Sequence, residues 1–506
     1  MKKKNLEKQI KQTGKKQGST QTSSSFDRSR QFAVITYSFL VIFLAMIGYV
    51  SYFLIEKSED FLNSAYNGRT EIYEASVDRG SILSADGQIL AENIEDIEST
   101  EMTDQNAALR NYPFGRMFSH IVGYQTALHG NSGIEAWANY NLSRSNSSII
   151  EQAVDEVTNE KYIGDNIYTT LDVDLQQTAY DALGTYKGAV IVMQPSTGKL
   201  LAVVSKPDFD PNTISQNWDV IVTDTESNSV LVNRATQGKY PPGSTFKTVT
   251  ALEYIREFPN YLDYSYDCVG TLTIGANKIS CYGNEKHGRV DLKESFTESC
   301  NTSFANIGLQ LDLDDFSDTA DSLLFNTVLP VSNMTASQSS FVLDSDSSVS
   351  EIMETAIGQG QTLVTPLHML MLTSAVANEG ILMEPYVIDH SETYDGSLVK
   401  QFDPVAYGEI MTKEESGLLK DFMIGTVETG TATLLSGQSY TAGGKTGSAE
   451  YSDTKGESHA WFTGFAESED KEDIAIAVIV EGAGIGSEYA VPIAKKVFDE
   501  YFSTME

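Results

Sequence analysis

Residues 32–55 form a run of 24 amino acids without a charged side chain. A bilayer core is crossed by roughly 20 helical residues, so this run predicts a membrane-spanning helix. A cleaved signal peptide is the alternative, but its apolar part has only about 7–15 residues and ends at small residues. This run is longer and ends in Tyr-Phe-Leu-Ile, which favours an uncleaved anchor. No second run of this length follows, so we expect a single-pass protein.

The charge of the chain changes sign at this run. Residues 1–30 carry nine Lys or Arg against two acidic side chains, a net charge of +7, whereas the remaining chain carries −42. Basic residues before a span predict a cytoplasmic N-terminus and an extracytoplasmic C-terminal part. The polar first 25 residues are typical of a disordered tail. The acidity of the rest argues against nucleic-acid binding, which needs a cationic surface.

Three cysteines are few for an exported chain, so the fold does not depend on a disulfide framework. Cys268 and Cys281 flank residues 271–280, which read as a hairpin with its turn near residues 275–277. The pattern leaves two interpretations open, a disulfide between these two sulfurs or a pair of buried thiols. Cys300 is interpreted as a packing residue rather than a nucleophile.

Residues 56–165 lie between the apolar run and the motifs described below. They contain Arg79-Gly80, the hairpin signal Asp86-Gly87 between short apolar stretches, and Gly133-Ile-Glu135. None of these places a nucleophile beside a base, so we interpret the region as structural.

The remaining chain predicts an α/β unit. Nearly continuous apolar runs indicate strands of a sheet that is covered on both faces. Helical stretches lie between the strands, so a sheet that joins N- and C-terminal segments is expected. The predicted strands are 188–193, 199–204, 460–465 and 474–480, and the predicted helices are 366–378, 413–428 and 491–501.

Residues 244–247, Ser-Thr-Phe-Lys, are the candidate for nucleophilic catalysis. They follow Pro-Pro-Gly, so a helix should begin at about Ser244. Residues i and i+3 share a helix face, which brings the Ser244 hydroxyl towards the Lys247 amine. A desolvated lysine can take the proton of a serine, and a helix N-terminus stabilises an oxyanion. Taken alone, this pattern is more often a serine N-cap beside a surface lysine.

Two further motifs support the catalytic interpretation of residues 244–247. Residues 299–301, Ser-Cys-Asn, lie 55 residues after Ser244, and residues 445–448, Lys-Thr-Gly-Ser, lie a further 146 residues on. The first triplet is expected on a loop after a helix at 292–298, where a hydroxyl could relay a proton. The second is expected on an edge strand, where a glycine lets a substrate backbone approach. Together the three match the S-x-x-K, S-x-N and K-T-G pattern.

With these motifs, the chain resembles the class B, monofunctional penicillin-binding proteins, which are peptidoglycan D,D-transpeptidases. Residues 79–80, 133–135, 188–204, 358–360 and 365–366 also match that family. The resemblance implies a penicillin-binding/β-lactamase-like α/β domain, an antiparallel sheet flanked by helices, with a small membrane-proximal α+β domain. The expected parts are a basic tail (1–31), a transmembrane helix (32–55), a pedestal or dimerisation-like domain (56–165) and the transpeptidase domain (166–506).

The resemblance also implies a role for the catalytic residues. Ser244 would attack the penultimate D-Ala carbonyl of a stem pentapeptide and release the terminal D-Ala, with Lys247 as the base. Ser299 would pass the proton to the leaving group, and Asn301 would orient the acyl chain. An amine of a second stem would then resolve the acyl-enzyme and form a crosslink.

The third motif would bind the substrate carboxylate. Lys445, Thr446 and Ser448 would hold the terminal carboxylate of the stem or that of a β-lactam, and Gly447 would allow the substrate to pair with the strand. The N–H groups of Ser244 and Ser448 would form the oxyanion hole. The family more often has threonine at the position of Ser448. No metal or organic cofactor is expected for this chemistry.

The resemblance implies partners as well: peptidoglycan stem peptides, β-lactams, the membrane, and a polytopic glycan polymerase of the SEDS type within the cell-wall synthesis machinery. Three alternatives share the fold, namely a D,D-carboxypeptidase, a β-lactamase, and a non-catalytic penicillin-binding scaffold or sensor. A glycosyltransferase domain before the transpeptidase is excluded, because the roughly 110 residues from 56 to 165 are too few for one.

Overall fold

The computed structural model describes residues 22–53, 77–94, 109–126, 128–146, 162–223, 229–451 and 457–503. The chain divides into two units, residues 1–67 and residues 68–506. Most of the expected tail lies outside the described residues.

The first unit contains one long helix, α2 (Thr22–Tyr52), which begins ten residues before the apolar run. Its part Phe32–Tyr52 has a mean hydropathy of 2.2 and is fully exposed in this structure. Its length and composition suffice to cross a bilayer, as the sequence predicts.

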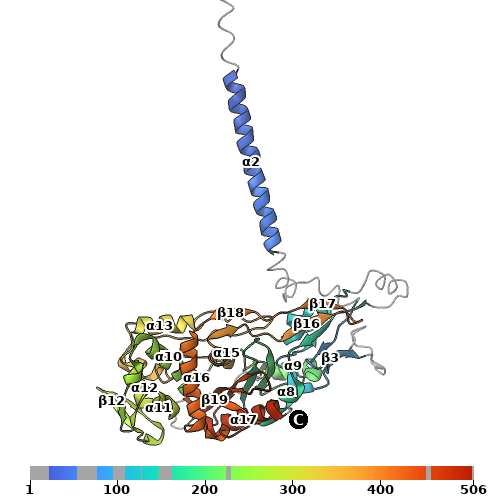
Figure 1. The fold of residues 1–506 in the computed structure, drawn as a ribbon. Coiled ribbons are helices and arrows are strands. Elements are labelled where there is room, and N and C mark those ends of the chain that lie inside the picture. The colour runs from blue at the N-terminus through green and yellow to red at the C-terminus, as the bar shows by residue number, and fades with distance from the viewer. Residues whose placement is uncertain are drawn as a thin grey trace, which may run out of the picture. The chain divides into compact units, whose positions relative to one another are not determined.

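The second unit is built on a five-stranded antiparallel sheet (Figure 1). One strand of an N-terminal hairpin pairs with the first of three adjacent C-terminal strands. The sheet therefore joins distant parts of the chain, as predicted. Strand β19, which carries the third motif, lies at the edge. The strand order is β10 (Leu200–Lys206), β9 (Gly188–Met193), β21 (Ile474–Val480), β20 (Ser458–Glu467) and β19 (Thr441–Glu450).

Both faces of this sheet are covered. Helices α8 (Val173–Leu183) and α17 (Gly486–Ser503) pack on one face, whereas α15 (Pro366–Ala377) and α16 (Lys413–Glu428) pack on the other. Alternate residues of β9 enter two different cores, since side chains of a strand point to opposite faces. This explains why the strand sequences read as continuous apolar runs. Every residue of α15 is buried.

A second sheet of six strands includes segments on both sides of the expected boundary at residue 165. Its order is β17 (Leu398–Gln401), β16 (Ile388–Glu392), β8 (Asn166–Thr169), β2 (Ile82–Leu83), β3 (Ile89–Ile94) and β4 (Leu109–Asn111). Strands β2 and β3 form the hairpin predicted from Asp86-Gly87. Because β2 pairs with β8, strands β2 to β4 belong to the same sheet as strands that follow residue 165.

Short ribbons and helices complete the second unit. The ribbons are β1 (Val77–Asp78) with β7 (Tyr162–Ile163), β5 (Gln125–Thr126) with β6 (Gly130–Asn131), β11 (Tyr266–Cys268) with β14 (Gly288–Val290), β12 (Thr271–Ile274) with β13 (Asn277–Ser280), and β15 (Ile381–Met383) with β18 (Ala406–Glu409). The other α-helices are α5 (Gly133–Trp137), α6 (Asn139–Leu142), α9 (Ile214–Thr223), α10 (Lys247–Glu257), α11 (Leu292–Thr297), α12 (Asn301–Gly308), α13 (Leu313–Ser322) and α14 (Val349–Thr355).

Candidate active site

The first motif forms the start of a helix, as predicted. Residues Gly243–Phe246 make one 3-10 turn, η4, which runs directly into α10. Ser244 is partly buried on this turn, and among the described residues its hydroxyl makes no hydrogen bond. Within the described part of the chain, this hydroxyl is therefore not tied to a protein partner.

Neighbouring segments hold this turn from two sides. Gly243 N donates to Gly358 O (2.8 Å), and a Cβ on Gly358 would lie 2.0 Å from Gly243 O. Trp461 of β20 donates from Nε1 to Pro241 O (3.1 Å). The Gly-Gln-Gly segment at 358–360 therefore packs against the nucleophile's turn, and its first glycine is required by that close approach.

Lys247 is fully buried at the start of α10 and is held by the second motif. Its Nζ donates to Ser299 O (2.7 Å), Ser299 Oγ (3.2 Å) and Asn301 Oδ1 (2.7 Å). Burial lowers the pKa of Lys247 to about 7, while charge on the Cys300 and Cys281 thiols acts to raise it. Near pH 7 a large fraction of this amine is therefore neutral and able to accept a proton.

The second motif lies on the turn between α11 and α12, as predicted. A capping box of Asp291 and Glu294 fixes the start of α11. Ser299 follows the end of α11 with a left-handed φ of 54°, a position that usually carries glycine or asparagine. Strained backbone of this kind is typical of functional sites, and here it directs both oxygens of Ser299 at Lys247.

Asn301 is the first residue of α12 and bridges two segments. Its Oδ1 accepts from Lys247, and its Nδ2 donates to Ser280 O (3.1 Å) at the end of β13. This amide therefore links the lysine to the end of β13.

The third motif lies on edge strand β19, as predicted. Lys445 is fully buried, and its Nζ donates to Thr446 O (3.1 Å). Burial, together with the charge of Lys247, lowers the pKa of Lys445 well below its ordinary value. The two lysines compete for a proton in one buried site, so a bound carboxylate would favour the protonated form of Lys445.

The hydroxyls of this motif have partners on neighbouring elements. Thr446 Oγ1 lies 2.6 Å from Thr431 Oγ1, and Ser448 Oγ accepts from Gly486 N (3.3 Å) at the start of α17. These contacts fix the orientation of both hydroxyls before any ligand arrives.

Gly447 has a structural role in addition to the one expected. A Cβ at this position would lie 3.0 Å from Pro242 O, 3.1 Å from Trp461 Cβ and 3.2 Å from Thr245 Cγ2. The missing side chain thus lets β19 approach the nucleophile's turn, rather than only making room for a substrate.

Sequence reasoning did not identify Thr431 and Gln359 as parts of this site. Thr431 orients Thr446. With its amide oriented so that both atoms have a partner, Gln359 donates to Glu450 O (3.3 Å) and accepts from Glu450 N (3.2 Å). Gln359 could have been suspected from the two glycines around it, whereas no local pattern singles out Thr431.

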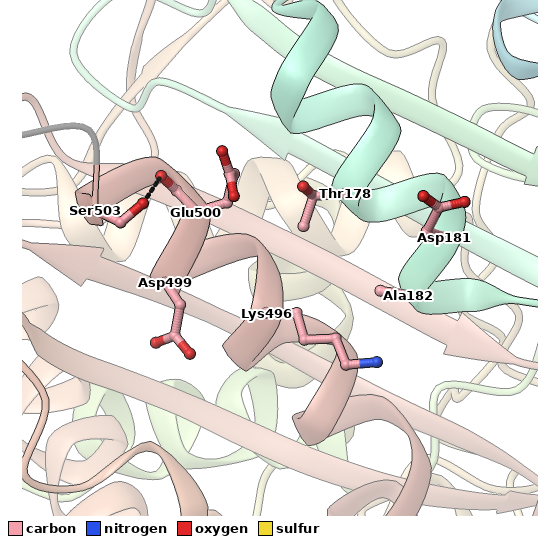
Figure 2. Close-up of a pocket in the computed structure, with 7 residues that line it drawn as sticks. All are labelled: Thr178, Asp181, Ala182, Lys496, Asp499, Glu500 and Ser503. Carbon is pink, nitrogen blue, oxygen red and sulfur yellow. Dashed lines mark hydrogen bonds between the residues drawn. The ribbon is translucent and has the colours of Figure 1, made fainter.

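A depression of about 420 Å³ lies elsewhere, between α8 and α17 (Figure 2). None of the motif residues lines it; its lining residues are Thr178, Asp181 and Ala182 of α8 and Lys496, Asp499, Glu500 and Ser503 of α17. The volume of this depression therefore does not indicate where the chemistry occurs.

A serine on a helix N-terminus, a buried lysine of lowered pKa one turn later and a second lysine on the facing strand are typical of serine–lysine acyl-transfer enzymes. The family model "Penicillin binding protein transpeptidase domain" matches residues 188–500, and "Penicillin binding protein A dimerisation domain" matches residues 79–167. The chain therefore belongs to the penicillin-binding protein transpeptidase family.

Individual relatives agree with this assignment. Peptidoglycan D,D-transpeptidase PbpA of Mycolicibacterium smegmatis is 28% identical over 455 residues, which cover 85% of this chain and 90% of that protein. The D,D-transpeptidase domain of a peptidoglycan glycosyltransferase from Eggerthella lenta has 28% identity and a TM-score of 0.74, covering 85% of this chain and 99% of that one. The imipenem acyl-enzyme of penicillin-binding protein A from M. tuberculosis has 26% identity and a TM-score of 0.75, with the same coverage.

Proposed function

We propose that this protein is a membrane-anchored peptidoglycan D,D-transpeptidase, which crosslinks stem peptides through a serine acyl-enzyme and is acylated by β-lactams. Its family and the names of its relatives support this activity. The related enzyme from M. tuberculosis forms acyl-enzymes with imipenem and penicillin G. The observation that carries the proposal is the buried Lys247, one turn after Ser244, with the pKa of its amine lowered to about 7.

Acylation begins when Ser244 Oγ attacks the carbonyl carbon of the penultimate D-Ala. The hydroxyl proton passes to Lys247, whose neutral amine is available near pH 7 because burial disfavours its charged form. Ser299 lies within hydrogen-bond distance of Lys247 Nζ and relays the proton to the departing nitrogen. The C–N bond breaks, the terminal D-Ala leaves as a free amine, and the acyl group stays on Ser244.

The terminal carboxylate is bound by the third motif. Lys445 gains a proton when the carboxylate arrives, because the negative charge offsets the burial that otherwise lowers the pKa of this amine. Thr446 and Ser448 supply hydroxyl groups, with Thr446 held in place by Thr431. The same groups would bind the carboxylate of a β-lactam, which explains why both ligands acylate one serine.

The second half of the reaction distinguishes the alternatives. An amine of a neighbouring stem attacks the acyl-enzyme in a transpeptidase, whereas water does so in a D,D-carboxypeptidase or a β-lactamase. All motif residues needed for acylation are present, which disfavours a non-catalytic scaffold or sensor.

The anchor and the region after it suggest where the enzyme works. The basic tail (1–31) would be cytoplasmic, residues 32–55 would span the membrane, and the membrane-proximal (56–165) and transpeptidase (166–506) parts would be extracytoplasmic. A polytopic glycan polymerase would contact the anchor and membrane-proximal region. Co-purification that persists after deletion of residues 32–165 would refute this partner site.

The activity is tested with the full-length protein in detergent, a stem pentapeptide as donor and a second stem with a free amine as acceptor. A transpeptidase forms a dimer of the two stems and releases one D-Ala per crosslink. D-Ala release without crosslinked product indicates a carboxypeptidase, and a penicilloyl adduct that turns over within seconds indicates a β-lactamase. Absence of D-Ala release and of acylation refutes an enzymatic role.

A further inference from the structure

Four metal-ligand side chains converge beside the second motif. The Sγ atoms of Cys268, Cys281 and Cys300 and a ring nitrogen of His287 all lie within 4.8 Å of one another. The Cys268–Cys281 and Cys281–Cys300 sulfur distances are each 3.7 Å, and Cys268 Sγ lies 3.3 Å from His287 Nδ1. These are all the cysteines of the chain, gathered at one point although up to 32 residues separate them.

The geometry points to a structural zinc site of the Cys3His type, formed by Cys268, Cys281, His287 and Cys300, which fixes the position of the second catalytic motif. Zinc binds thiolates at about 2.3 Å in tetrahedral geometry, which places two ligand sulfurs about 3.8 Å apart. The observed 3.7 Å agrees with that separation. A disulfide would require its sulfurs about 2.05 Å apart, and the structure has all three cysteines as free thiols.

The backbone brings the ligands together from two short ribbons and a helix start. Cys268 ends β11, and its partner in β14 is Gly288, so His287 lies next to that pair. Cys281 directly follows β13, and Cys300 is the N-cap of α12. Figure 1 shows β12, α11 and α12 together at one end of the second unit. A single ion would therefore tie both ribbons to the helix that carries Asn301.

The surroundings are those of a metal ligand shell. His287 approaches Cys268 through Nδ1, and its other ring nitrogen, Nε2, lies 3.9 Å from Glu285 Oε2, which is an ion-pair distance rather than a hydrogen bond. Thr302 Oγ1 lies 3.2 Å from the Cys268 sulfur and 3.4 Å from the Cys300 sulfur. A hydroxyl in this position can donate to a thiolate.

The three cysteines form a buried cluster of their own, with Tyr266 packed against it. Tyr266 and Ile279 of the ribbons also pack against the main hydrophobic core, but the sulfurs themselves contact one another. Two-stranded ribbons of three and four residues are marginal alone, and small segments without a core usually depend on a metal or a disulfide. A structural zinc supplies folding free energy directly.

The site is coupled to catalysis through the chain itself. Cys300 lies between Ser299 and Asn301, which together make all three hydrogen bonds to Lys247 Nζ. Holding Cys300 on an ion would maintain the left-handed backbone of Ser299 and the direction of both side chains. The zinc would take no part in the chemical steps, which agrees with the expectation that acyl transfer here needs no metal.

The test measures metal in the full-length protein, independently of transpeptidase activity. Purified wild-type protein should contain about one zinc per chain, with three sulfurs at about 2.3 Å and one nitrogen at about 2.0–2.1 Å by X-ray absorption. Protein without zinc that also fails to take it up from Zn²⁺ solution would overturn the proposal. A Cys268–Cys281 disulfide seen by mass spectrometry in the isolated protein would do the same.

Variants locate the site. His287→Ala and Cys268→Ser should retain less than about one fifth of the wild-type zinc, whereas the matched control His129→Ala, which changes a histidine stacked on Trp218, should retain all of it. Unchanged zinc in both ligand variants would overturn the assignment. Chelation of the wild type should slow penicillin acylation at least fivefold, and Zn²⁺ should restore it. An unchanged acylation rate would refute the positioning role, even where zinc is bound.

Discussion

Replacing Glu135 by glutamine should destabilise the second unit strongly, because this carboxylate pairs with two buried arginines. Arg79 Nε and Arg110 Nε each donate to it at 2.7 Å, and the exposed fractions of the three side chains are 0%, 7% and 3% for Glu135, Arg79 and Arg110. Burial raises the pKa of Glu135, but the two guanidinium groups lower it further, so the net shift is downward. The carboxylate is therefore charged at neutral pH.

The magnitude follows from burial. Removing one partner of a buried ion pair leaves an uncompensated charge and costs about 3–5 kcal/mol. Here two guanidinium groups lose their anionic partner, and Arg110 Nη2 already lacks a hydrogen bond among the described residues. We expect Glu135→Gln to lower the free energy of unfolding by about 3–5 kcal/mol.

A matched control separates burial from geometry. Lys293 and Asp421 pair at 2.6 Å, but their side chains are 43% and 59% exposed. Asp421→Asn should cost about 0–1 kcal/mol, since exposed pairs contribute little. Urea unfolding of the full-length proteins, followed by tryptophan fluorescence, measures both. Equal costs for the two variants, or a cost below about 1 kcal/mol for Glu135→Gln, would refute the reasoning.

Three further outcomes concern the active site. Lys247 must be neutral to accept a proton, and the pKa of its amine is about 7. The rate of penicillin acylation should therefore rise with pH up to about 7 and then level off. A rate that still rises at pH 9 would contradict this role of Lys247. Gly447→Ala should slow acylation about tenfold, since a Cβ 3.0 Å from Pro242 O displaces the nucleophile's turn; an unchanged rate constant means that the turn tolerates the methyl group. Thr431→Val should weaken β-lactam binding before acylation by about fivefold, whereas Thr431→Ser should retain it, because the hydroxyl orients Thr446. The concentration dependence of the acylation rate measures this affinity. Equal affinities of the two variants would contradict the role of Thr431.

The central sheet could be predicted from the sequence because its strands are long apolar runs. Residues 188–193 and 474–480 are buried throughout. Because both faces of the sheet are covered, these strands are continuous apolar runs rather than alternating apolar and polar residues. Of the second sheet, the sequence predicted only the hairpin of β2 and β3. Strands β2 and β4 have two and three residues, too few to show a period, and their pairing depends on contacts far apart in the chain.

The motif residues were predicted because their chemistry is local to three short segments. Their supports were not, since each lies on another element: Thr431 precedes β19 by ten residues, and the partners of Glu135 are 25 and 56 residues away. Spacing along the chain carries no information about such contacts. For the cysteines, the hairpin pattern left open a close approach of Cys268 and Cys281, whereas the approach of His287 and Cys300 depends on how two ribbons fold back on α12.

The central claim is that Ser244 is the acylated nucleophile. Intact-mass measurement of the full-length protein after incubation with penicillin G tests it most directly, with peptide mapping of the adduct. The wild type should gain the mass of one penicillin, located on the peptide that contains Ser244, and Ser244→Ala should gain none. Labelling that persists in Ser244→Ala, or an adduct on another residue, would contradict the account.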